Sequence, residues 1–281
     1  MTHLTSVLAI VAYVITSVVM LVQLWRPSRA GKTTKVAEIS FVIGLVLHSI
    51  TMLFVVRDPR FVLVDNGADY FLWVSWGVAM AFALLKRRLN YPLVGAFIVP
   101  GIVLFMGSSS YLLHKGSASV LSLPSDSGVE PLLLPFLHAV PAFVSVVSLA
   151  LAFVTSCVFL IVERRLKRPR VGVLTSFGPN LQILDLLNKQ LAQLGFVAIS
   201  LVVLSGGLWA VSQQKPVFSA DTSVVSGLVT WLLLAFILYV RLVLKWSPKQ
   251  VSRLTVFVTG SFFVSVFAVL VVAGRLTHVN L

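Results

Sequence analysis

The stretch LWAVSQQKPVFSADTSVVSGLVTWLLLAFILYVR, residues 208–241, contains the pattern that decides the fold. It starts at the end of one apolar segment, crosses a short polar stretch between Ser212 and Asp221, and enters a second apolar segment that reaches Arg241. The second segment has about the 20 residues that an α-helix needs to cross a hydrocarbon core. The pattern predicts two membrane-spanning helices joined by a small loop, with Trp209 beside the loop and Trp231 inside the second helix.

The composition of the whole chain extends this prediction. Of 281 residues, 58% are hydrophobic and only 11% are charged, and the mean hydropathy is +1.00. A soluble domain of this length could not cover its surface with so few polar groups. We therefore expect a multi-pass protein whose first partner is the lipid bilayer.

Apolar runs of membrane length recur along the chain and predict about eight transmembrane helices in one all-α bundle. The spans are expected near residues 5–25, 37–56, 69–85, 92–113, 132–162, 191–211, 222–242 and 254–276. Between the fifth and sixth spans, residues 163–190 carry several cations and then leucines and isoleucines at helical spacing, so we expect a cytoplasmic amphipathic linker there. Residues 1–281 are interpreted as a single transmembrane domain.

The net charge of +13 is explained by topology. All but five of the 22 Lys and Arg residues lie in the four loops that alternate spans assign to one side, which is the positive-inside pattern. The five on the other side are Arg57, Arg60, Lys115, Lys215 and Arg275. This distribution predicts both termini outside and gives no soluble basic face for a nucleic acid.

Enzyme motifs are missing from the sequence. It contains no GxSxG, HExxH, phosphate-binding or dinucleotide-binding pattern. No Asp or Glu falls in the middle of a predicted span, which disfavours a carboxylate proton relay. We therefore favour a protein without catalytic activity.

Histidines are the strongest candidates for chemistry, because all five are predicted on the outer side or in the outer half of a span. They are His3, His48, His114, His138 and His278. A neutral imidazole can ligate a metal, and two on facing helices can hold haem iron axially. An isolated interfacial histidine is usually only a solvated polar residue, as we expect for His3 and His114. His48 lies deep in an apolar run, where either a functional role or a hydrogen bond to a neighbouring helix would explain it.

The tryptophans leave two interpretations open. Trp76 and Trp209 lie near span ends, where interfacial anchoring accounts for most such rings. Trp231 lies well inside its span. A group of aromatic rings on the outer side would also suit the face of a porphyrin.

The order of short motifs resembles the CcsA/HemX-like cytochrome c assembly family, and within it the HemX/YpjD-type members. The similar segments are Leu47-His48, the FLWVSW of residues 71–76, the LHA of residues 137–139, the PNLQILD of residues 179–185, the GLWA of residues 207–210, the LVTWLLLAF of residues 228–236, and the late outer His278. The family's tryptophan-rich WGxxWxWD core is absent, and residues 215–221 read KPVFSAD in its place.

This resemblance implies a haem-handling protein of a bacterial plasma membrane that binds or transfers haem at its outer half. It implies that His138 and His278 ligate the iron, that His48 holds haem in transit, and that Trp209, Trp231 and Trp76 pack against it. It also implies partners among cytochrome c maturation or haem-synthesis proteins.

A second function remains open, a non-catalytic HemX-like regulator or scaffold. It would act on a tetrapyrrole-synthesis enzyme or a cytochrome maturation complex, and residues 163–190 would dock that partner. A small-molecule transporter is a third option, but only Pro100-Gly101 suggests the broken helix that such proteins need.

Overall fold

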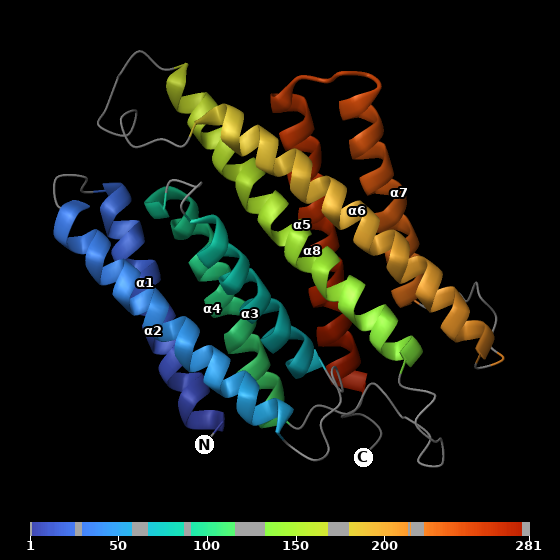
Figure 1. Ribbon diagram of the computed structural model, residues 1–281, viewed down its shortest axis with the longest axis horizontal. Helices are drawn as coiled ribbons and strands as arrows, with labels where there is room; N and C mark the ends of the chain where they lie inside the picture. Colours follow the sequence, from blue (N-terminus) through green and yellow to red (C-terminus); the bar gives the residue numbers. More distant parts are fainter. Residues whose placement is uncertain are drawn as a thin grey trace. The chain divides into compact units, whose positions relative to one another are not determined.

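The computed structural model describes residues 2–25, 30–57, 67–86, 91–115, 133–167, 180–212, 214 and 222–276 (Figure 1). Within these residues every regular element is an α-helix, and the predicted all-α class is confirmed. The helices are α1 (Thr2–Trp25), α2 (Ala30–Val56), α3 (Gly67–Leu85), α4 (Tyr91–Lys115), α5 (Leu133–Leu166), α6 (Leu181–Ser212), α7 (Thr222–Leu242) and α8 (Pro248–Leu276).

Seven of these helices, α1 to α7, are long and apolar enough in their described parts to cross a membrane. Their apolar stretches run from the 18 residues of Ala68–Leu85 to the 32 residues of Leu181–Ser212. The chain is therefore a multi-pass helical membrane protein. The eighth predicted span coincides with α8, a helix of 29 residues. The placement of both termini outside stays a prediction.

Each predicted span corresponds to one helix, but helix ends extend beyond the apolar runs. The largest difference is in α6, which begins at Leu181 and continues to Ser212 without interruption. Residues 181–190 of the expected amphipathic linker thus form the first part of α6 and residues 163–166 the end of α5, while residues 168–179 fall outside the described residues. The Asn180 side chain caps this start, since its Oδ1 accepts a hydrogen bond of 2.8 Å from the Gln182 amide.

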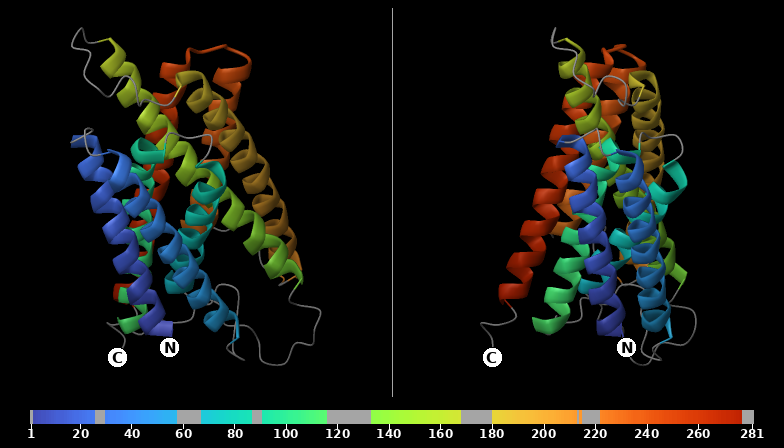
Figure 2. Two further views of the ribbon diagram at one scale, coloured as in Figure 1. Left: turned by 60° about the vertical axis from the view of Figure 1, so that its left-hand side comes forward. Right: turned by 90° about the vertical axis from the view of Figure 1, so that its left-hand side faces the viewer.

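The chain divides into two compact units, which are described separately. The first contains Met1–Ser117 and Val158–Asp185, and the second contains Ala118–Cys157 and Leu186–Leu281. In the first unit α1 packs against both α2 and α4, and α3 packs against α4 (Figures 1 and 2).

Hydroxyl pairs join α1 to α2 at two levels of the first unit. The Thr16 and Ser40 hydroxyls are 2.8 Å apart, and those of Thr5 and Thr51 are 2.9 Å apart. Such interhelical hydrogen bonds contribute about 0.6 kcal/mol each inside a membrane, with a range up to about 2 kcal/mol. They fix the register of the two helices.

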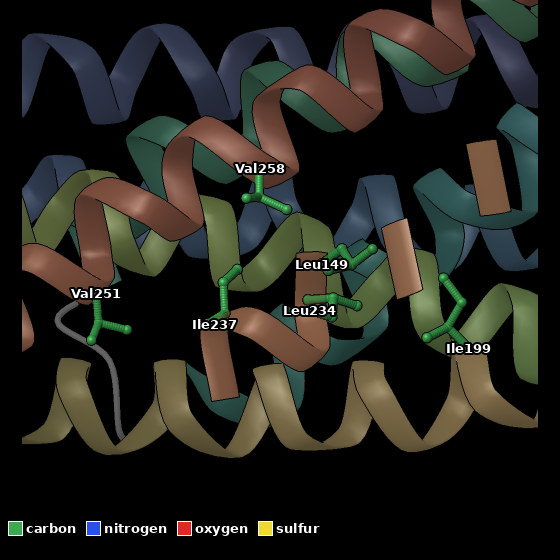
Figure 3. Packing of buried hydrophobic residues seen from close by; sticks show 6 residues of the cluster. All are labelled: Leu149, Ile199, Leu234, Ile237, Val251 and Val258. Carbon is green, nitrogen blue, oxygen red and sulfur yellow. The ribbon is translucent and has the colours of Figure 1, made fainter. Parts of the chain in front are cut away.

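Four helices contribute to the apolar core of the second unit. Its buried cluster consists of Leu149 from α5, Ile199 from α6, Leu234 and Ile237 from α7, and Val251 and Val258 from α8. Figure 3 shows these side chains converging from the four helices.

The connection between α7 and α8 shows how local sequence sets a tight turn. Lys245 has a positive φ of 51°, and the Trp246 amide donates to the Val240 carbonyl at 3.0 Å, so the last turn of α7 is closed by its own backbone. Ser247 then caps α8, with its amide 3.1 Å from Gln250 Oε1, and Pro248 occupies the first helical position. α7 and α8 are therefore held as an antiparallel pair.

Polar groups also join three helices of the second unit around Asn188. Its amide donates to the Ala152 carbonyl of α5 at 3.3 Å and to the Ser156 hydroxyl. Its carbonyl oxygen accepts a bond of 3.0 Å from the Arg241 guanidinium of α7. This network links α5, α6 and α7 through one buried side chain.

Candidate haem-ligand site

The predicted site residues belong to the two units. His48 and Trp76 lie in the first unit, whereas His138, Trp209 and Trp231 lie in the second. His278 falls outside the described residues. The structure brings His138 and Trp209 together. It also places Trp76 in contact with Ser49, the residue that follows His48.

His138 stands one and a half turns after the start of α5 and faces α6. Its Nδ1 atom lies 3.2 Å from the Val202 carbonyl oxygen and 3.4 Å from the Ser205 hydroxyl. A carbonyl oxygen can only accept a hydrogen bond, so this contact requires the proton on Nδ1. The other ring nitrogen, Nε2, forms no hydrogen bond with any residue that the structure describes, and it then carries the lone pair that can ligate a metal.

Two further residues of α6 contact the His138 ring. The Trp209 and His138 ring centroids are 6.0 Å apart, with the planes inclined at 54°. At Gly206, a Cβ atom would lie 3.2 Å from His138 Cε1 and 3.3 Å from Nδ1, which is tighter than ordinary van der Waals contact. The close approach of the half-buried imidazole to α6 therefore depends on the missing side chain at this position.

Trp231 has contacts that explain its depth in α7. Its indole N–H donates to the Ser200 hydroxyl of α6 at 2.9 Å. Its ring stacks on Phe196, with centroids 6.0 Å apart and planes at 18°. These contacts make Trp231 part of the α6–α7 packing, and its expected contact with haem stays a prediction.

His48 is fully buried in the first unit, at 0% exposure. The backbone of Leu72 in the neighbouring helix α3 interacts with the imidazole as a weak hydrogen-bond partner. Neither ring nitrogen, however, meets a described residue at full hydrogen-bond distance and angle. Burying an unpaired polar group costs about 1–3 kcal/mol. The weak backbone contact with Leu72 bears on one of the two explanations that the sequence left open for His48, a hydrogen bond with a neighbouring helix, and both explanations stay predictions.

Tyr13 of α1 packs directly against His48. The two ring centroids are 6.0 Å apart with an edge-on angle of 74°, and the Tyr13 hydroxyl is also buried without a partner in the described part of the chain. Phe41 also lies 5.9 Å from Tyr13, centroid to centroid. His48 thus sits in closed aromatic packing that contains unpaired polar atoms.

Trp76 lies in α3 and bonds to α2 beside His48. Its indole N–H donates to the Ser49 hydroxyl at 3.0 Å, and its ring is perpendicular to that of Trp73 at 6.2 Å between centroids. This hydrogen bond joins α2 to α3 one residue after His48. A direct role in binding a ligand stays a prediction.

Two other histidines lie on described helices of the first unit. His3 is exposed on α1, and His114 lies in the last turn of α4. Among the described residues, no group of three or more His, Cys, Asp or Glu side chains could hold a metal ion.

Comparison with known proteins assigns the chain to a family. Residues 66–277 match the family described as Cytochrome C assembly protein. The chain belongs to this family. It is 23% identical over 214 residues to a protein of Guillardia theta named cytochrome c biogenesis protein CcsA, covering 68% of this chain and 67% of that one. It is 22% identical over 285 residues to a CcsA of Prochlorococcus marinus strain NATL1A, covering 92% and 87%. No solved structure matches significantly.

The family match and the site geometry overlap only in part. The matched region of this cytochrome c assembly protein contains His138, Trp209, Trp231 and Trp76, all on α3 and later helices. His48 precedes it, and His278 follows its last residue. The site around His138, together with Trp231 and Trp76, is therefore the part of the haem prediction that coincides with the family's shared region.

Sequence reasoning did not identify four contributors to the two histidine sites of this family member. Val202, Ser205 and Gly206 contact His138, and Tyr13 contacts His48. A signal for the first three existed, because residues 202, 205, 206 and 209 fall on one face of a helix at spacings of three and four. Tyr13 has no comparable signal, since a tyrosine in an apolar run is usually a packing residue.

Proposed function

We propose that this protein is an integral membrane haem-handling protein that binds or transfers haem at its outer half, with His138 as an axial ligand. The observation that carries the proposal is the hydrogen bond from His138 Nδ1–H to the Val202 carbonyl. Metal-ligating histidines almost always donate their second ring nitrogen to a carbonyl or carboxylate, which fixes the tautomer and orients the ligating atom. The described residues contain such an arrangement at His138.

The residues at this position fit haem. Nε2 of His138 supplies a neutral nitrogen, and iron in haem supplies an axial position that accepts one. The indole of Trp209 adds an aromatic surface beside the imidazole. His278, predicted from the sequence on the same outer side, is the proposed second axial ligand. Trp231 and Trp76 are proposed to line the path of haem through their respective units.

His48 is proposed to hold haem in transit. Its two buried nitrogens lack partners in the described residues, which suits a side chain that meets its ligand only part of the time. The aromatic contacts with Tyr13 imply that the packing around His48 opens to admit haem. Access to His48 would then be the controlled step in transfer.

The subfamily and cellular setting are part of the same proposal. The loop between α6 and α7 contains no tryptophan between Ser212 and Asp221, which favours a HemX/YpjD-type member over one that presents haem on a tryptophan-rich loop. Such a protein would lie in a bacterial plasma membrane. Its partners would be cytochrome c maturation or haem-synthesis proteins.

Absorption spectroscopy of the purified protein tests haem binding. The protein in detergent, as isolated or after addition of hemin, should show a Soret band. This band should weaken strongly in His138→Ala and His278→Ala. The matched control is His3→Ala, which removes an exposed imidazole on α1 and should leave the spectrum unchanged.

Two results would contradict the proposal. One is a colourless protein that does not take up added hemin. The other is a Soret band that persists unaltered in the His138→Ala, His278→Ala double variant. If charge reversal across residues 164–170 abolished capture of a tetrapyrrole-synthesis enzyme while the histidine variants behaved as wild type, the regulator function would replace haem handling.

A further inference from the structure

We infer that Gly206 and Ser205 of α6 are positioning residues for His138. Together with the Val202 carbonyl, they hold the imidazole in the tautomer and orientation that leave Nε2 as the ligating atom. The inference rests on the proposed haem function, and it adds two α6 residues whose side chains would not themselves contact iron.

Two groups of α6 face Nδ1 of His138. The Val202 carbonyl lies 3.2 Å from this atom and the Ser205 hydroxyl lies 3.4 Å from it. The Ser205 hydroxyl donates its own hydrogen to the Leu201 carbonyl at 2.7 Å, so its lone pairs remain to accept from Nδ1–H. Two acceptors on one side of the ring favour the Nδ1-protonated tautomer over the alternative.

Gly206 leaves space for the imidazole ring of His138. An added Cβ would meet the imidazole at 3.2 Å and 3.3 Å, so the ring would have to withdraw by a few tenths of an ångström. A withdrawal of about 0.3 Å along the bond would stretch the contact between Nδ1 and the Val202 carbonyl to about 3.5 Å, the outer limit of a hydrogen bond. Glycine at this position therefore leaves room for the ring at the distance of the bond that selects the tautomer.

Backbone preference does not explain why residue 206 is a glycine. Gly206 lies inside the continuous helix α6, where alanine would be favoured by about 1 kcal/mol on helix propensity alone. A Gly206→Ala variant should consequently fold, and its defect should appear at His138. This separates a positioning role from a general structural one.

The chain offers a matched control on the same helix. A Cβ at Gly195 would lie 3.6 Å from the Ser148 Cβ and 3.8 Å from Leu149 Cδ2, which is ordinary van der Waals contact. Gly195→Ala makes the same chemical change in α6 without approaching His138. For Ser205, the conservative variant Ser205→Thr keeps the hydroxyl and Ser205→Ala removes it.

The experiment measures the tautomer of His138 in the haem-free protein and then the affinity for hemin. Histidine-labelled protein in detergent is examined by 15N NMR, and the His138 signals are identified by their loss in His138→Gln. Wild type, Gly195→Ala and Ser205→Thr should show a protonated Nδ1 and an unprotonated Nε2. Gly206→Ala should show a mixture of tautomers, with a smaller change in Ser205→Ala. Hemin should bind Gly206→Ala about tenfold more weakly than Gly195→Ala. Loss of the hydrogen-bond partner of a metal ligand typically lowers affinity about 10- to 100-fold, and we expect the lower end of that range.

The outcomes separate this inference from the proposed function. A Gly206→Ala variant with the wild-type tautomer overturns the inference, even if wild type binds hemin. A changed tautomer in Gly206→Ala, in a protein whose wild type binds no hemin, supports the positioning role and refutes the haem function. A changed tautomer with unaltered hemin affinity also overturns the inference, because the positioning would then have no consequence for ligation.

Discussion

Gly44→Ala in α2 gives the sharpest test of the packing around His48. A Cβ at residue 44 would lie 2.9 Å from Cε1 of Tyr13, 3.0 Å from Cδ1 and 3.3 Å from Cγ. All three are atoms of a rigid ring, and the ring is fully buried against Phe41 and His48. Tyr13 therefore cannot move aside without displacing its neighbours.

The expected magnitude follows from two opposing effects. Inserting a methyl group into a well-packed core costs about 1–3 kcal/mol. Replacing glycine by alanine inside a helix stabilises the helix by about 1 kcal/mol. Gly107→Ala in α4 isolates the second effect, because a Cβ there would have nothing within 4 Å. We therefore expect Gly44→Ala to be less stable than Gly107→Ala by the whole overpacking cost of about 1–3 kcal/mol.

Reversible unfolding in one detergent, followed by circular dichroism, measures both variants against wild type. In a Tyr13→Leu background the penalty of Gly44→Ala should fall, since the ring that it meets is gone, and a double-mutant cycle gives the coupling energy. Equal stabilities of Gly44→Ala and Gly107→Ala, with no coupling to Tyr13, would refute the close approach of α1 and α2 at this level. The packing described around His48 would then be wrong.

Three further predictions concern buried polar groups. His48→Leu should stabilise the haem-free protein by about 1–3 kcal/mol in thermal unfolding, because it removes two buried nitrogens without partners in the described residues; a clear loss of stability would show that the imidazole has an internal partner. Trp231→Phe should cost about 1 kcal/mol through the lost bond to Ser200 while keeping the ring stack, and a double-mutant cycle with Ser200→Ala should show that the two losses are not additive. Asn188→Leu should destabilise the protein by about 1–3 kcal/mol in the same unfolding assay, since it removes the side chain that joins α5 to α6 and accepts from Arg241, and an unchanged midpoint would contradict the network.

Much of the fold could be predicted because apolar length is a local property. All eight helices coincide with runs that the hydropathy of the chain marks as spans, and the turn between α7 and α8 is encoded by adjacent residues such as Ser247 and Pro248. Helix ends were less predictable. α6 begins ten residues before the apolar run that starts at Leu191, because an amphipathic segment can continue a helix beyond the apolar run.

For the candidate site, the sequence could predict the types of side chain but not the contacts between them. The sequence marks His138 and Trp209 as an imidazole and an indole near one side of a membrane, and in the structure their rings are neighbours. The sequence does not reveal that Nδ1 of His138 bonds to a carbonyl 64 residues away, or that Gly206 makes this approach possible. Contacts over such separations depend on which faces of two helices meet.

By itself the sequence determined that this chain is a multi-pass helical membrane protein and which residues could carry its chemistry, because lipid requires long apolar helices and leaves few places for imidazoles. Only the tertiary structure decided that His48 is enclosed by Tyr13 and that His138 is anchored on α6. The physical reason is that lipid-facing and helix-facing surfaces are about equally apolar, so hydropathy does not encode pairing. Helices in a membrane choose their partners through close packing at small residues and through a few interhelical hydrogen bonds.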